Sequence, residues 1–200
     1  LYIGFSSGLS ATCKAGQTAA EDLRGQFPER KILVVDTLAA SLGQGMLVYL
    51  AANKREEGAT IEETAQWLED HKLNLCHWFT VEDLFFLKRG GRISAATAVL
   101  GSMLSIKPIM HVDNDGHLIN VGKARGRRGA IAELCNRMEK SAVNPGEQTI
   151  FISHGDCKED AETLASMIRE KIGVKDVIIG CIGAHSGPGT LALFYLGSER

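Results

Sequence analysis

The sequence lacks a long apolar run, paired cysteines and any excess of charge of one sign. No apolar stretch reaches the ~18 residues of a membrane-spanning helix. The 22 basic and 24 acidic residues give a net charge of −2, so the composition favours neither a nucleic-acid ligand nor a general affinity for membranes. The cysteines are scattered and form no C-x-x-C motif, which predicts reduced thiols and a cytoplasmic location. They are Cys13, Cys76, Cys135, Cys157 and Cys181.

The beginning of the chain carries no Met, signal peptide or linker. Leu1 to Phe5 is typical of the end of a β-strand, and we therefore expect further residues upstream of Leu1. The 200 residues themselves, of which 44% are hydrophobic and 23% charged, suffice for one large domain or two small ones with a buried core.

The first part of the chain alternates apolar and amphipathic segments. Residues 2–5 and 32–36 are short apolar runs, and the second has the form of a strand buried on both faces of a parallel sheet. Helical periodicity predicts helices over 10–27 and 39–55, and a capping box at 60–63 predicts the start of a third. This alternation predicts an α/β fold with a parallel, helix-covered sheet.

The pattern changes after residue 80. Residues 106–112 and 117–121 flank the sequence DNDG, which predicts an antiparallel hairpin. We therefore place a boundary between an N-terminal α/β lobe, residues 1–80, and a C-terminal lobe with a mixed sheet, residues 81–200. The other elements predicted in the second lobe are helices over 81–87 and 127–141, strands over 149–153 and 176–182, and a helix between these two strands.

Gly4-Phe5-Ser6-Ser7-Gly8 forms a hydroxyl-rich turn between a predicted strand and a predicted helix. Free backbone N–H groups and serine hydroxyls at such a turn bind a carboxylate or phosphate, although a plain N-cap turn has the same pattern. The segment also matches the G-x-S-x-G nucleophile elbow of α/β hydrolases, and His185 follows in the appropriate order. A serine esterase with Ser6 as nucleophile is therefore an alternative function.

Two basic segments contain glycine, at residues 88–94 and 123–128. Arg92 follows two glycines that let the backbone approach an anion, and its guanidinium supplies fork-shaped donors. Arg125 belongs to a group of four cations directly before a predicted helix, where positive charge opposes the helix dipole unless an anion or a partner compensates it. A solvated basic turn is the alternative interpretation of both segments.

The loop at residues 183–190 places His185 among three glycines, directly after a predicted strand. Ligands of open α/β sheets bind at the carboxyl ends of strands, so this loop indicates either a binding site or a plain turn. Asp113 and Asp115 resemble a calcium loop only superficially, and no metal is expected. The other histidines show no ligand spacing, and we interpret them as surface or satisfied core residues. They are His71, His77, His111, His117 and His154.

Six motifs occur in the order and approximate spacing of one protein family. They are SSGLSAT, VVDTLAASLGQG, LKRGGRIS, LSIKPIM with a following DG, KARG, and GAHSGPGT. From Ser6 to Gly197 the chain resembles the DegV family of bacterial fatty-acid-binding proteins. This resemblance implies two α/β lobes with a long-chain fatty acid bound between and within them. It also implies a lipid carrier without catalysis of its own, which presents the carboxylate to the catalytic subunit of a fatty acid kinase.

The resemblance assigns roles position by position. Ser6 and Ser7 match the hydroxyl site that holds the carboxylate, and His185 matches a histidine of the same hydrogen-bond network. Arg92 and Arg125 match basic residues at the mouth of the site. The family also uses a Thr from a segment that precedes this chain. The resemblance implies no cofactor, metal or nucleic acid, and it leaves a transient contact with a membrane surface open.

Overall fold

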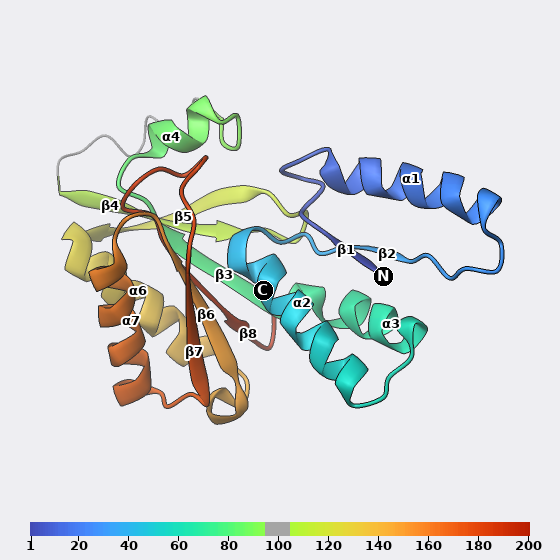
Figure 1. The fold of residues 1–200 in the computed structure, drawn as a ribbon. Coiled ribbons are helices and arrows are strands. Elements are labelled where there is room, and N and C mark those ends of the chain that lie inside the picture. Colours follow the sequence, from blue (N-terminus) through green and yellow to red (C-terminus); the bar gives the residue numbers. More distant parts are fainter. Residues whose placement is uncertain (95–104) are drawn as a thin grey trace.

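The computed structural model describes residues 1–94 and 105–200, which form two β-sheets with their helices (Figure 1). The smaller sheet has two parallel strands, with Ile3 opposite Val35. The capping box is confirmed: Thr60 Oγ1 accepts a hydrogen bond from the N–H of Glu63, whose carboxylate accepts one from the N–H of Thr60. The elements of this part are β1 (Tyr2–Gly4), α1 (Thr12–Gln26), β2 (Val34–Asp36), α2 (Ser41–Glu56), α3 (Ile61–His71) and a 3₁₀ turn (Lys72–Asn74).

The larger sheet has six strands in the order β5-β4-β3-β8-β6-β7. Strands β6 and β7 are parallel, whereas every other neighbouring pair is antiparallel. The expected combination of a small parallel sheet and a mixed sheet is therefore confirmed. The elements are β3 (Leu75–Thr80), α4 (Leu84–Arg89), β4 (Ile106–Val112), β5 (Leu118–Arg125), α6 (Gly126–Ser141), a 3₁₀ turn (Pro145–Glu147), β6 (Thr149–His154), α7 (Lys158–Lys171), β7 (Asp176–Cys181) and β8 (Leu191–Leu196).

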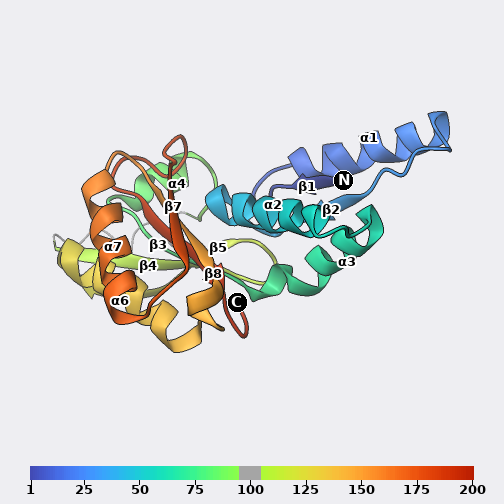
Figure 2. The same cartoon turned by 60° about the horizontal axis from the view of Figure 1, so that its bottom comes forward.

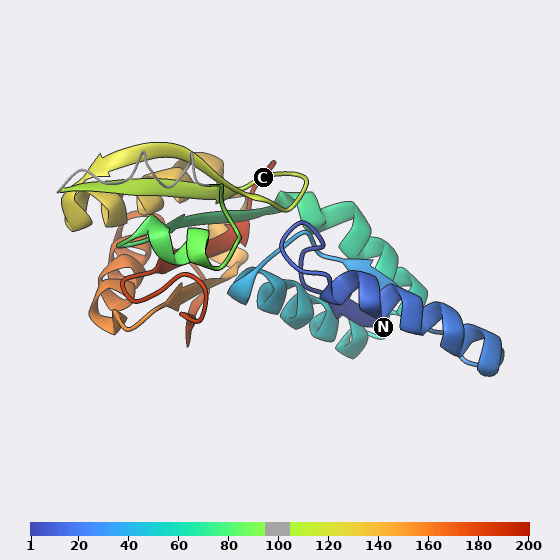
Figure 3. The ribbon, with the colours of Figure 1, turned by 90° about the horizontal axis from the view of Figure 1, so that it is seen from above.

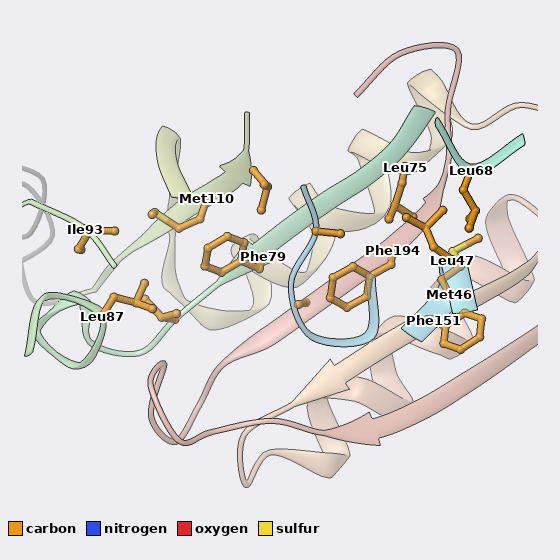
Figure 4. Close-up of a cluster of buried hydrophobic side chains, with 14 of the residues drawn as sticks. Met46, Leu47, Leu68, Leu75, Phe79, Leu87, Ile93, Met110, Phe151 and Phe194 are labelled. Atoms are coloured by element: carbon orange, nitrogen blue, oxygen red, sulfur yellow. The ribbon is translucent and has the colours of Figure 1, made fainter. Parts of the chain in front are cut away.

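Two hydrophobic clusters cover opposite faces of the larger sheet, because successive side chains of a strand alternate between its faces. In β8, Leu193 and Tyr195 pack in a cluster with α6 and α7. Ala192 and Phe194 instead belong to a cluster with residues of α2, α3 and β3, part of which is drawn in Figure 4. Helix α2 therefore belongs to the core of both sheets and joins the two parts of the molecule.

The small sheet with α1, α2 and α3 projects to one side of the larger sheet, so the molecule is elongated (Figure 2). Seen from above, the turn before α1 lies beside the β4–β5 hairpin, and α4 lies beside the loop that follows β7 (Figure 3). The second contact is close, since a Cβ atom on Gly187 would lie 2.5 Å from the ring of Phe86. These contacts bring four separate segments to one region.

The sequence predicted neither β3 nor β8, which form the centre of the larger sheet. Strand β3 begins at Leu75, so the division between the two sheets falls a few residues before the expected boundary at residue 80. Helix α4 begins at Leu84 instead of residue 81, because the Asp83 side chain caps it by accepting a hydrogen bond from the N–H of Phe85.

Candidate functional site

A cavity of about 490 Å³ lies against the α2 side of the larger sheet. Strands β3 and β8 form its floor through His77, Phe79, Ala192 and Phe194. The other lining residues come from the turn before α1, the start of α2, α4 with its following loop, the β4–β5 hairpin, and the loop after β7. They are Phe5, Leu9, Ser10, Ala40, Ser41, Leu87, Arg92, Val112, Leu118, Ile182, Gly183, Ala184, His185, Ser186 and Thr190.

Polar side chains gather at one edge of this mainly apolar cavity. Thr80 ends β3 opposite Leu191, where β8 begins. Cys181 ends β7 opposite His154, which itself pairs with Leu191, so the loop after β7 lies at this edge of the sheet. This loop contributes His185 and Ser186 to the cavity wall. Such an arrangement, with an apolar chamber and convergent polar groups at one end, is typical of a site for an amphiphile.

The N-terminus of α2 also faces the cavity, through Ala40 and Ser41. No side chain caps the helix, and its first turn carries no acidic residue, so its positive dipole end is available to an anion. Leu38 and Ser41 both have left-handed backbone angles, with φ of 50° and 55°. Strain of this kind concentrates at ligand sites. The Ser41 hydroxyl donates a 3.0 Å hydrogen bond to Ser153 Oγ, which fixes the start of α2 on β6.

Ser6 follows Phe5, which lines the cavity, but is not itself one of the lining residues. Its side chain is fully buried (0% exposed). Its hydroxyl donates a 2.9 Å hydrogen bond to the carbonyl of Gly116 and accepts one of 3.2 Å from the N–H of Gly8. Its N–H donates to the carbonyl of Ala39. Ser6 thus holds the turn at residues 4–8, which we call the serine turn, between the start of α2 and the β4–β5 hairpin.

Of the four predicted site residues besides Ser6, two line the cavity: His185, which is exposed, and Arg92, which is half-buried. The guanidinium of Arg92 donates a hydrogen bond to the carbonyl of Gly90. Ser7 is exposed beside the turn and donates its N–H to Asp36 Oδ1. Arg125 is exposed at the junction of β5 and α6, and it does not line the cavity.

The interpretation of His77 as a surface or satisfied core residue is wrong. His77 is 1% exposed and lines the cavity, yet neither ring nitrogen has a hydrogen-bond partner among the residues that the structure describes. Burial holds the pKa of His77 well below its usual range, so the imidazole is neutral. A buried polar group without a partner costs about 1–3 kcal/mol of stability. The cause is tertiary: β3 turns His77 toward the cavity.

The other buried histidine, His111, is satisfied as expected. Its Nδ1 lies 2.8 Å from the carbonyl oxygen of His77, which accepts the hydrogen bond, and its ring stacks on Trp78 with centroids 4.1 Å apart. Burial lowers the pKa of His111 to about 4.

The geometry does not favour the esterase alternative. A nucleophilic serine needs a base within hydrogen-bond reach and access to substrate, whereas the Ser6 hydroxyl is fully buried between backbone groups.

The β4–β5 turn contains three possible metal ligands whose ligand atoms are close enough together to approach one ion: Asp113, Asp115 and His117. Asp113 Oδ1, however, already accepts the N–H groups of Asp115 and His117, which is the geometry of a turn.

The fold is a two-part α/β fold with a mainly apolar cavity. Residues 1–198 match the family described as "Uncharacterised protein, DegV family", and the chain belongs to this family. A DegV domain-containing protein of Clostridium perfringens (strain 13 / Type A) is 52% identical over 204 residues, which cover 100% of this chain and 70% of the relative.

Solved structures share the fold. One, described as "Fatty Acid Binding of a DegV family Protein from Thermus thermophilus", has a TM-score of 0.85 and 31% identity, covering 98% of this chain and 69% of that one. The Streptococcus pneumoniae Fatty Acid Kinase (Fak) B3 protein, loaded with linoleic acid, has a TM-score of 0.89 and 20% identity, covering 97% of this chain and 70% of that one. Within the described residues, no helix combines the length and the apolar character needed to cross a membrane.

Proposed function

We propose that this protein binds a long-chain fatty acid in the cavity and carries it without catalysis of its own. The observation that supports this function best is the shape of the cavity, with apolar walls over β3 and β8 and polar groups at one edge. Its volume of about 490 Å³ falls in the ~300–1,000 Å³ range of small-molecule sites. The fatty acid binding described for the Thermus thermophilus relative supports the same ligand class.

The apolar walls supply most of the affinity. Each buried methylene contributes ~0.8 kcal/mol, so a chain of about 14 methylenes contributes roughly 11 kcal/mol against association costs of ~4–15 kcal/mol. The tail must therefore be almost wholly enclosed. Phe79 and Phe194 on the sheet, with Leu87 of α4 opposite, provide the enclosing surface.

The proposed position of the carboxylate is between the turn that carries Ser6 and Ser7 and the loop that carries His185. The turn that carries both serines contributes Phe5, Leu9 and Ser10 to the cavity wall, and the uncapped N-terminus of α2 faces the same space. The hydroxyls, the imidazole and the helix dipole together offset the desolvation of a carboxylate. They determine where the head group lies more than how tightly the lipid binds.

The carrier presents the carboxylate to the catalytic subunit of a fatty acid kinase. Arg92 at the cavity and Arg125 on the exposed surface contact the partner or the phosphorylated head group, since an acyl phosphate carries more charge than a carboxylate. The likeness of fold to the Fak B3 protein supports this role. The carrier itself requires no cofactor or metal.

Organic extraction and mass spectrometry of the purified full-length protein test the ligand. We expect about one fatty acid per protein molecule, and rebinding of a fatty acid after delipidation. A protein that neither co-purifies with a fatty acid nor takes one up when delipidated would contradict the carrier function.

A further inference from the structure

Arg200 is a half-buried cation without a counter-ion. Its guanidinium donates four hydrogen bonds of 2.7–3.1 Å, all of them to backbone carbonyl oxygens. No ion pair joins it to an acidic side chain among the residues that the structure describes. Burial lowers the pKa of Arg200 to about 10, so the side chain stays charged at neutral pH. A charge in such a place is costly unless an opposite charge compensates it, so an anionic ligand nearby would be favoured.

The four carbonyl groups place this charge beside the cavity. They belong to Leu38, Lys72, Leu75 and Asp113. Three of these residues are one or two positions from a residue that lines the cavity. The pairs are Leu38 with Ala40, Leu75 with His77, and Asp113 with Val112. Arg200 itself does not line the cavity, so its charge lies behind the wall that the start of α2, β3 and the β4–β5 hairpin form.

The serine turn is attached to two of these three segments. The N–H and the hydroxyl of Ser6 donate hydrogen bonds to the segment before α2 and to the turn of the hairpin. Arg200 bridges the same two segments through Leu38 and Asp113. The buried charge and the serine turn, which carries two of the proposed carboxylate ligands, therefore lie at the same end of the cavity.

The charge of Arg200 acts on the cavity wall. Burial is the main cause of the lowered pKa of His77, and the positive charge of Arg200 lowers this pKa further. A charge that disfavours a proton on a lining imidazole favours a carboxylate bound in the same region. The effect is larger than in water, because the effective dielectric constant of a protein is about 20 and that of water about 80.

We propose that Arg200 makes the cavity selective for an amphiphile with an ionised head group over a neutral amphiphile of the same chain length. This inference rests on the proposed fatty-acid cavity and adds a residue, outside the cavity wall, that determines which head group the cavity accepts. Arg200 acts through space on the charge of the ligand and does not touch the ligand itself.

Competition binding with delipidated full-length protein tests the inference. The probes are myristic acid and 1-tetradecanol, which share the chain length and differ in the charge of the head group. We expect the unsubstituted protein to bind the acid at least about tenfold more tightly than the alcohol. Arg200→Gln should lower the affinity for the acid about tenfold, which corresponds to about 1.4 kcal/mol, and leave the affinity for the alcohol unchanged.

Two further variants separate the charge of Arg200 from its support of the fold. Arg200→Lys keeps the charge but offers fewer donors to the four carbonyl groups. It should keep the preference for the acid even where it is less stable, and it decides the question if Arg200→Gln does not fold. Arg137→Gln is the matched control, since it removes a cation of α6 that lies over Trp78 on the opposite face of the sheet. This control should change the affinities for both probes by the same factor.

Three outcomes would overturn the inference and leave the carrier function intact. The first is a loss of the preference for the acid in Arg200→Lys, and the second is an equal loss of affinity for both probes in Arg200→Gln. Either result would show that Arg200 only supports the fold. The third is equal binding of the acid and the alcohol by the unsubstituted protein. Failure of the unsubstituted protein to bind myristic acid at all would overturn both this inference and the fatty-acid carrier.

Discussion

The hydroxyl of Ser6 donates a hydrogen bond to the carbonyl of Gly116, 110 residues further along the chain. This bond joins the serine turn of the N-terminal part to the β4–β5 hairpin of the larger sheet. Gly116 has a φ of +79°, and a Cβ atom on it would lie 2.1 Å from Ser6 Oγ. The position of the serine turn therefore depends on a glycine far away in the sequence.

Gly116→Ala should destabilise the protein and weaken fatty-acid retention, because the new methyl group displaces Ser6. Gly126→Ala is the matched control, since Gly126 also has a positive φ (+69°) but open space around it. The control should lose only the ~1–2 kcal/mol of left-handed strain, and Gly116→Ala should lose clearly more. Denaturant unfolding and lipid quantification measure both effects. Equal losses in the two variants would show that the contact with Ser6 is unimportant.

Replacing Ser6 and Ser7 together with Ala should weaken fatty-acid retention, since the carboxylate would lose charge-assisted hydrogen bonds of ~1.5–3 kcal/mol. Ser166→Ala, at an exposed position of α7, is the control and should bind normally. The retained fatty acid is measured by mass spectrometry. Stoichiometric labelling of Ser6 or Ser7 by a fluorophosphonate probe would instead support the esterase.

Arg92→Ala and Arg125→Ala should leave fatty-acid binding nearly intact and reduce acyl-phosphate formation in an assay with the partner kinase. The reason is that the phosphoryl product carries more charge than the carboxylate. His185→Ala should impair both steps, because it belongs to the head-group network. Arg169→Ala, exposed on α7, is the control. This division of roles would be contradicted by an arginine variant that retains less fatty acid but forms a normal amount of acyl phosphate per bound fatty acid.

Acidification should destabilise the protein before its carboxylates titrate. Burial lowers the pKa of His111 from 6.5 to about 4, so the unfolded chain binds a proton more readily than the folded protein between these values. The contribution of His111 to stability is therefore greatest above pH 6.5, and it falls by about 1.5 kcal/mol between pH 6.5 and 5. Urea unfolding at several pH values measures this slope, and His111→Gln should reduce it. An unchanged slope in the variant would assign the effect to other groups.

The sequence by itself determined the family and much of the local structure. Ordered motifs from Ser6 to Gly197 indicated the DegV family, and the match of residues 1–198 confirms it. The capping box of α3 and the DNDG hairpin were predicted correctly, because side-chain bonds to the neighbouring backbone and turn residues act over a few positions. These signals are local, and a single sequence contains them in full.

Only the tertiary structure decided how the central sheet and the cavity are built. Strands β3 and β8 pair with each other across more than 110 residues, from Leu75 opposite Leu196 to Thr80 opposite Leu191. Each is buried against helices on both faces, so neither shows the alternation that identifies a strand in a sequence. The same pairing turns His77 toward the cavity, and hydrogen bonds to Ala39 and Gly116, both far from Ser6 in the sequence, bury Ser6. Those directions depend on which strands meet and in what register, and the residues nearby in the sequence do not determine either.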